Sequence, residues 1–149
     1  MIGEKVRGMN ISNIEFFFPN LIYSVYKITS PYDTTYNCIA WAAEDTNMWW
    51  APAPGYYWPA DVPRINSLEA YIAVFEKRGY KEVTDDALEP DYKKVAIFTR
   101  DGTPTHVSLQ LDSGLWTSKL GKSEDIQHDL QGVSGETYGN VAIILKRPK

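Results

Sequence analysis

The sequence predicts an α+β fold in which N-terminal helices pack on an antiparallel β-meander. Two observations support this order: an amphipathic helix pattern in the first half of the chain and, after it, strand-like runs joined by connections of hairpin length. The chain has 149 residues, of which 44% are hydrophobic. This is enough for one closed core and too little for two. We therefore expect residues 1–149 to form a single domain.

The clearest predicted helix spans Ser67–Arg78. Its apolar residues recur at i, i+3, i+4 and i+7 and form one stripe that should cover a core: Leu68, Tyr71, Ile72 and Phe75. Ser67 suits the N-cap, where its hydroxyl accepts from a free backbone N–H, and Gly79 suits the left-handed residue that ends a helix. Both ends of the segment therefore agree with the periodicity.

Two shorter helices are expected nearer the N-terminus. The first spans Ile11–Phe18 and ends before Pro19, because a residue that precedes proline is pushed out of the helical region. An extended segment, Leu21–Ile28, follows. The second helix should begin at Cys38, since good helix formers follow this residue and Asn37 before it is a favourable N-cap.

The second half of the chain is rich in strand signals. The predicted strands are Lys94–Thr99, Thr105–Leu111, Leu115–Leu120 and, near the C-terminus, Asn140–Lys146. Short turns that contain Gly102 and Gly114 join the first three, so these strands should pair antiparallel. The intervening segment Asp125–Leu130 is expected to be a helix or a loop.

An aromatic loop is predicted over Asn47–Pro63. The chain contains 5 Trp, 10 Tyr and 5 Phe, and many of these rings gather here among prolines, which are incompatible with regular helix or sheet. Two interpretations stay open. The rings provide large, rigid contact surfaces, so the loop could line a substrate cleft or could plug the core.

Composition excludes several classes of protein. With 15 basic and 19 acidic residues the net charge is −4, which argues against a nucleic-acid partner. One Cys and two His supply neither a disulfide nor a structural zinc site, so we expect no metal. The thiol chemistry considered below needs no organic cofactor, and we expect none. The basic residues at Lys93–Lys94 and Lys119–Lys122 are expected to face solvent.

No targeting or membrane-spanning segment is predicted. The apolar run Ile14–Leu21 is interrupted by Glu15, Pro19 and Asn20, and it is too short to cross a bilayer. We therefore predict a soluble cytoplasmic protein with no membrane partner, and delivery as an effector stays open.

One constellation of residues suits nucleophilic catalysis. Cys38 is expected in the first turn of a helix, where free N–H groups and the helix dipole favour a thiolate. His106 should lie at the start of a core strand and could serve as its base. Ser118, on the neighbouring strand, could orient the imidazole. Four other polar residues compete for that orienting role: Gln110, Asp112, Asp125 and His128.

The oxyanion of such a reaction needs hydrogen-bond donors. The Cys38 N–H is the first candidate, together with the Asn37 amide or the Tyr36 hydroxyl.

Each of these residues also has a structural interpretation. A lone Cys38 among apolar neighbours is often a small buried hydrophobic residue. His106 could be a core histidine and Ser118 an ordinary strand hydroxyl. His128, which lies between acidic residues, is expected to be a surface histidine.

The order of motifs resembles the papain-like cysteine peptidases and amidases of the NlpC and CHAP types. The resemblance rests on Tyr36-Asn37-Cys38, Thr105-His106-Val107-Ser108-Leu109, and the polar Ser118 after Asp112-Ser113-Gly114. It implies a papain-like fold in which the cysteine heads a helix, the histidine heads the following sheet and the third polar residue lies on the next strand.

Two further similarities are present. The Asn-Cys pair is similar to that of the lecithin retinol acyltransferase relatives. A small group of uncharacterised bacterial proteins resembles the chain over Tyr36–Ala43, Trp49–Trp50, Trp116–Gly121 and Ile126–Asp129. Neither similarity adds a substrate.

The leading functional hypothesis is a cysteine hydrolase or acyltransferase that acts on an amide or peptide-type bond of a small-molecule or peptide acyl substrate. The aromatic residues expected to contact that substrate are Tyr36, Trp41, Trp49, Trp50 and Trp58. The alternative is a catalytically inactive papain-like binding or immunity-type module, in which the Trp- and Tyr-rich loop holds a protein partner.

Overall fold

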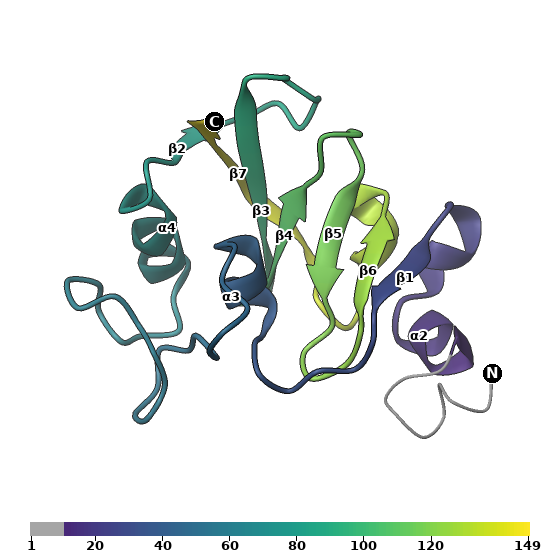
Figure 1. Cartoon of the computed structure of the whole chain (residues 1–149), viewed down its shortest axis with the longest axis horizontal. Helices are drawn as coiled ribbons and strands as arrows, with labels where there is room; N and C mark the ends of the chain where they lie inside the picture. The colour runs from purple at the N-terminus through teal and green to yellow at the C-terminus, as the bar shows by residue number, and fades with distance from the viewer. Residues whose placement is uncertain (1–10) are drawn as a thin grey trace.

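Seven antiparallel strands form one sheet in the computed structural model, which describes residues 11–149. The strand order is β1-β6-β5-β4-β3-β7-β2 (Figure 1). The strands are β1 Lys27–Ser30, β2 Lys81–Val83, β3 Tyr92–Arg100, β4 Thr103–Gln110, β5 Trp116–Lys119, β6 Asp125–His128 and β7 Asn140–Pro148. The helices are short: α2 Ile11–Phe17, α3 Cys38–Ala42 and α4 Leu68–Glu76, with 3-10 turns η1 Pro19–Tyr23 and η2 Leu130–Val133.

The α+β class and the antiparallel pairing are confirmed. Strands β3, β4, β5 and β6 follow one another as a meander, and β7 returns to pair with the free edge of β3. The predicted helix boundaries hold to within two residues. The Ser67 hydroxyl accepts from the Ala70 N–H at 3.1 Å, and Gly79 has φ +91°.

Three features differ from the prediction. The first four residues of Asp125–Leu130 form β6 instead of a helix or loop, because Ile126 and His128 both point to a buried face and β5 offers a free edge. The segment Leu21–Ile28 was expected to be extended, but its first residues, up to Tyr23, belong to η1. Strand β1 precedes α3 in the chain, so strands and helices are less segregated than the sequence suggested.

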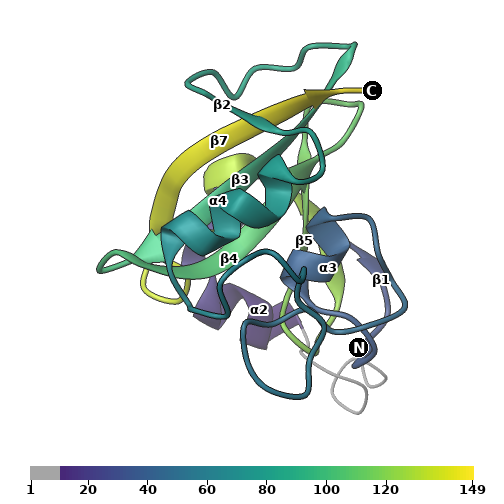
Figure 2. The ribbon, with the colours of Figure 1, turned by 90° about the vertical axis from the view of Figure 1, so that its left-hand side faces the viewer.

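The sheet is buried on both faces, and its strands therefore alternate between two cores. On one face α3, α4 and the aromatic loop cover Val95, Ile97, Val107 and Leu109. On the other face α2, η1 and η2 cover Ala96, Phe98, Trp116 and Ile126. Figure 2 shows α4 on the near side of β3 and β4. Each polar side chain on a central strand must therefore find its partner inside the protein.

Two lysines expected at the surface are fully buried. Lys119 donates from Nζ to the carbonyl oxygens of Asp33, Gly121 and Ser123 at 2.6, 2.9 and 2.6 Å. Lys94 is held by the Asp85 and Ala87 carbonyls, each at 2.7 Å, and by Glu89 at 2.8 Å. The expectation was wrong because strand alternation turns these ammonium groups inward, where loop carbonyls take the place of water.

None of the helices within residues 11–149 has both the length and the apolar composition needed to cross a membrane.

Gly139 is required by the close approach of two chain segments. Its φ is +76°, and a Cβ at this position would lie 2.0 Å from the Thr99 carbonyl oxygen. Gly139→Ala should lower the free energy of unfolding by more than about 2 kcal/mol, because backbone strain and a steric clash add together. Gly79→Ala is the matched control, since φ is +91° there and no atom lies within 4 Å; it should cost about 1 kcal/mol. Urea unfolding measures both, and equal losses would contradict the steric argument.

Candidate active site

The start of α3 is fixed by the side chain of Asn37. Its Oδ1 accepts from the N–H groups of Ala40 at 3.3 Å and Trp50 at 3.1 Å, and its Nδ2 donates to the Trp50 carbonyl at 2.7 Å. The predicted N-cap is confirmed. The same amide also clamps the aromatic loop to the helix, and these contacts occupy the group that was predicted to stabilise an oxyanion.

Cys38 is the first residue of α3, as predicted, and it retains partial exposure. Burial of the thiol raises its pKa. The backbone N–H groups of Val107, Ile39 and Cys38 lie near the sulfur and oppose that rise. The thiol therefore reaches β4 at the residue next to His106.

His106 is fully buried within β4, and not at the start of the strand as predicted, because β4 already begins at Thr103. Its ring stacks on Tyr138, with centroids 4.0 Å apart and an interplanar angle of 4°, and it also contacts Phe98. Nε2 lies 2.8 Å from Ser118 Oγ. Nδ1 has no hydrogen-bond partner within the described part of the chain. Burial, with a smaller contribution from His128, lowers the pKa of His106 well below its usual value, so the ring is neutral at pH 7.

Ser118 is the centre of a buried polar chain. Besides His106, its Oγ contacts Ser108 Oγ at 2.8 Å and His128 Nε2 at 2.7 Å. The His128 Nδ1 in turn lies 2.6 Å from the Asp129 carbonyl oxygen. The prediction of His128 as a surface histidine was wrong, because β6 turns this side chain into the core.

The Cys38 thiol and the His106 imidazole lie on opposite faces of the sheet. The thiol approaches β4 at Val107, which is next to His106 in the strand. Val107 belongs to the core under α3, whereas His106 stacks among residues of the other core. Counted from the hairpin turn, Leu109–Thr117 is the last registered pair of β4 and β5. We call the stretch beyond this pair, where Ser108 and Ser118 contact each other only through their side chains, the β4–β5 fork. No hydrogen bond joins the Cys38 sulfur to a ring nitrogen of His106.

The other candidates for orienting the imidazole bond elsewhere. Gln110 donates to the Asp86 carbonyl at 2.9 Å, and Asp112 pairs with Lys149 at 2.7 Å. Asp125 accepts from the Tyr36 hydroxyl at 2.7 Å. Ser118 and, through it, His128 are therefore the candidates that the structure joins to the ring.

Most of the predicted substrate-binding aromatics are structural. Trp50 and Trp58 are buried in the core under α4, and Tyr36 is buried against Asp125. The loop acts at these positions as a core plug. Trp49 is half-buried. Trp41 alone of the five predicted residues is among those lining a cavity described below.

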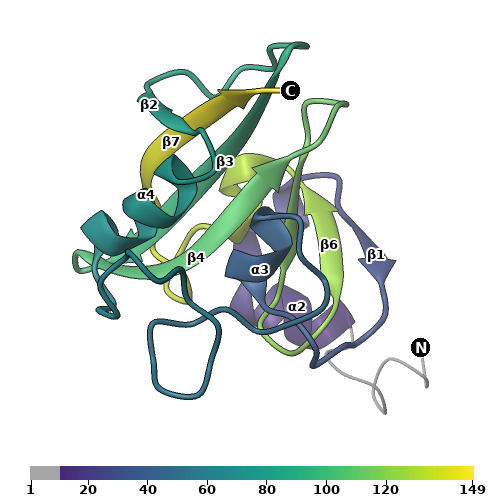
Figure 3. The same cartoon turned by 60° about the vertical axis from the view of Figure 1, so that its left-hand side comes forward.

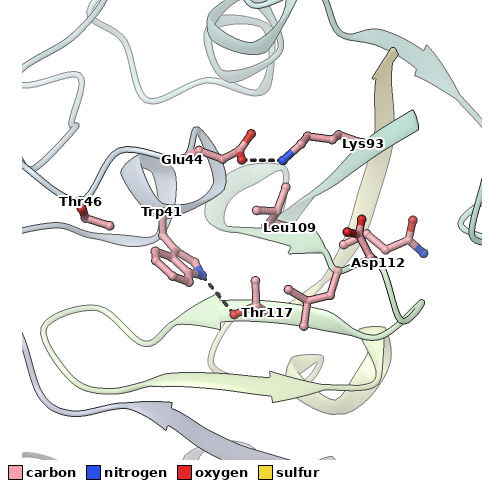
Figure 4. Close-up of a pocket in the computed structure, with 9 residues that line it drawn as sticks. Trp41, Glu44, Thr46, Lys93, Leu109, Asp112 and Thr117 are labelled. Carbon is pink, nitrogen blue, oxygen red and sulfur yellow. Dashed lines mark hydrogen bonds and ion pairs between the residues drawn. The ribbon is translucent and has the colours of Figure 1, made fainter. Parts of the chain in front are cut away.

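That cavity lies between α3 and the β4–β5 hairpin and has a volume of about 330 Å³. Figure 4 shows Trp41 on one wall, where its Nε1 donates to Thr117 Oγ1 at 3.1 Å, with Leu109 beside it. Glu44 and Lys93 form an ion pair at the rim. Because Trp41 is one helical turn after Cys38, and Leu109 pairs with Thr117 where the fork begins, the cavity adjoins the fork. Figure 3 shows α3 next to β4.

Residues 27–146 match a family described as a domain of unknown function (DUF7689). The chain belongs to this family. The DUF7689 match begins at β1 and ends within β7, so it contains Cys38, His106, Ser118 and His128. No curated protein and no solved structure matches the chain significantly.

No group of three or more His, Cys, Asp or Glu side chains in residues 11–149 is arranged to hold a metal ion. The sequence patterns did not indicate a role for Ser108, and they predicted His128 at the surface. The available signal was strand alternation, because His106 and Ser108 share a face of one strand and Ser118 lies opposite them. His128 joins this set only if Asp125–His128 is assigned as a strand.

The buried histidines predict acid sensitivity. Burial lowers the pKa of His128 to about 4, and that of His106 lies well below the ordinary 6.5. As the pH falls, both imidazoles bind a proton in the unfolded chain at a higher pH than in the folded protein. Their contribution to the free energy of unfolding is therefore complete above pH 6.5 and is lost as the pH falls below that value. From pH 7 to pH 5 they should remove about 3 kcal/mol from the free energy of unfolding.

Urea unfolding at both pH values measures this loss. His128→Gln removes one of the two groups and should remove about half of the pH dependence. An identical pH dependence in the variant would contradict the assignment.

Proposed function

We propose that this protein is a cysteine hydrolase or acyltransferase that attacks an amide or peptide-type carbonyl through Cys38. The observation that supports the proposal most strongly is the buried His106 ring: Ser118 holds its Nε2, while Nδ1 is free to accept a proton. Native proteins rarely leave a buried polar atom unpaired, and a catalytic role is one of the reasons for which such an atom is retained.

The proposed reaction has two half-reactions. As the Cys38 sulfur bonds to the carbonyl carbon, its proton passes to His106 Nδ1, and the carbonyl electrons move to oxygen. The tetrahedral intermediate collapses, the C–N bond breaks, and the leaving amine takes the proton from Nδ1. The thioester is then attacked by water or a second nucleophile, which gives its proton to His106 Nδ1; the C–S bond breaks, the acyl product leaves, and the Cys38 sulfur takes that proton back. Catalytic hydrogen bonds are commonly long before substrate binds. In this proposal the proton moves from the Cys38 sulfur to His106 Nδ1, from one face of the sheet to the other, at the β4–β5 fork.

The oxyanion would be stabilised by backbone donors. Asn37 caps Ala40, which leaves the N–H groups of Cys38 and Ile39 at the start of α3 close to the sulfur. The Asn37 side chain supports this geometry through the N-cap.

A papain-like fold is part of the same proposal. A cysteine that opens a helix, a histidine on the facing sheet and a polar residue on the next strand support this finer classification. The acyl chain of the substrate would lie in the cavity between Trp41 and Leu109, and a small-molecule or peptide acyl compound of the cytoplasm would fit the proposal.

A specific observation favours the alternative, an inactive binding module. Burial raises the pKa of Cys38, and its sulfur has no hydrogen bond to His106. The two functions predict opposite reactivity of the thiol.

Alkylation by iodoacetamide separates them. If His106 activates Cys38, the native protein should react rapidly at pH 7, and His106→Gln should slow the reaction about 10²-fold or more because it removes the base. Gln keeps a donor toward Ser118, and an unfolding curve checks that the variant is folded. A thiol that reacts only after denaturation would establish the structural role of Cys38.

Acyl transfer itself is testable with p-nitrophenyl acetate. The wild-type protein should release about one equivalent of p-nitrophenolate in a burst and gain the mass of one acetyl group at Cys38. Cys38→Ala should abolish both signals. Persistence of the burst in that variant would place the reactive nucleophile elsewhere.

A further inference from the structure

The single hydroxyl hydrogen of Ser118 makes the polar chain directional. A hydroxyl donates once and accepts twice. Ser118 Oγ has three partners at 2.7–2.8 Å: His106 Nε2, Ser108 Oγ and His128 Nε2. It must therefore donate to one of them and accept from the other two.

The Asp129 carbonyl decides which partner receives that hydrogen. A carbonyl oxygen only accepts, so His128 Nδ1, 2.6 Å away, carries a proton and donates it. Because the buried His128 has a pKa of about 4, its ring is neutral at pH 7 and its Nε2 bears a lone pair. Ser118 accordingly donates to His128 and accepts from Ser108 Oγ–H and from His106 Nε2–H.

We infer that His128 is a positioning residue: acting through Ser118, it holds His106 in the Nε2–H tautomer and so keeps the lone pair on Nδ1. This inference rests on the proposed function only for its catalytic meaning, because Nδ1 is the atom proposed to accept the Cys38 proton. The tautomer itself follows from the hydrogen bonds. His106 Nδ1 is buried and has no partner of its own in residues 11–149, so no contact on that side fixes the tautomer.

Four matched variants test the direction of the chain. His128→Phe keeps a ring but removes the acceptor, and Ser118→Ala removes the hydroxyl. His128→Gln presents a carboxamide oxygen near the former Nε2 and should restore the acceptor. Ser108→Ala removes a different hydrogen bond to the same hydroxyl, and this bond does not set the direction.

The readout is ¹⁵N NMR of the His106 ring in the full-length protein. Wild type, His128→Gln and Ser108→Ala should each show a proton on Nε2 and a lone-pair shift at Nδ1. In His128→Phe and Ser118→Ala the two nitrogen shifts should converge as the Nδ1–H tautomer gains population. A wild-type proton on Nδ1, or unchanged shifts in His128→Phe, would overturn the inference. Should a variant fail to fold, the wild-type spectrum alone still tests the predicted tautomer.

Alkylation by iodoacetamide then tests separately whether the tautomer of His106 affects the reactivity of Cys38. If His106 activates Cys38, the iodoacetamide rate in His128→Phe should fall by the fraction of His106 that has lost the Nδ1 lone pair, and His128→Gln should rescue it. A converging NMR signature with no change in rate would overturn the proposed function and leave the positioning role of His128 standing.

Discussion

Burial of both sheet faces is the constraint on which the rest of the structure depends. Helices and loops cover the strands on each side, so water does not satisfy the polar groups of the central strands. Lys94 and Lys119 consequently bind loop carbonyls. His106, Ser118 and His128 bond to one another for the same reason.

The candidate site forms where the pairing of β4 with β5 ends. The last registered pair counted from the hairpin turn is Leu109–Thr117, and the Cys38 sulfur lies near the backbone of Val107 beyond it. The helix that carries Cys38 is only five residues long, and Asn37 fixes its first turn. Geometry at the site therefore depends on an amide clamp and on the sheet register more than on helix length.

Much of the architecture could be predicted from local patterns. The α4 stripe, its Ser67 cap and the glycine after it are visible in the sequence because helix periodicity and capping are local properties. The hairpin turns likewise predicted the β3–β5 meander. Strand β6 was missed because Ile126 is its single apolar residue, which is too few to show alternation, and its edge pairing with β5 comes from outside the segment. The aromatic loop stayed ambiguous because composition does not specify what lies beneath Trp50 and Trp58.

By itself, the sequence determined the fold class, the place of Cys38 at the start of a helix and the placement of His106 and Ser118 on adjacent strands. Only the tertiary structure decided that His128 is buried and joins Ser118, that Asn37 is engaged by Trp50, and that the thiol and imidazole approach β4 from opposite faces. The physical reason is that helix caps and turns depend on neighbours in the chain. Burial and hydrogen-bond direction depend instead on register between strands, and register brings together residues that are distant in sequence.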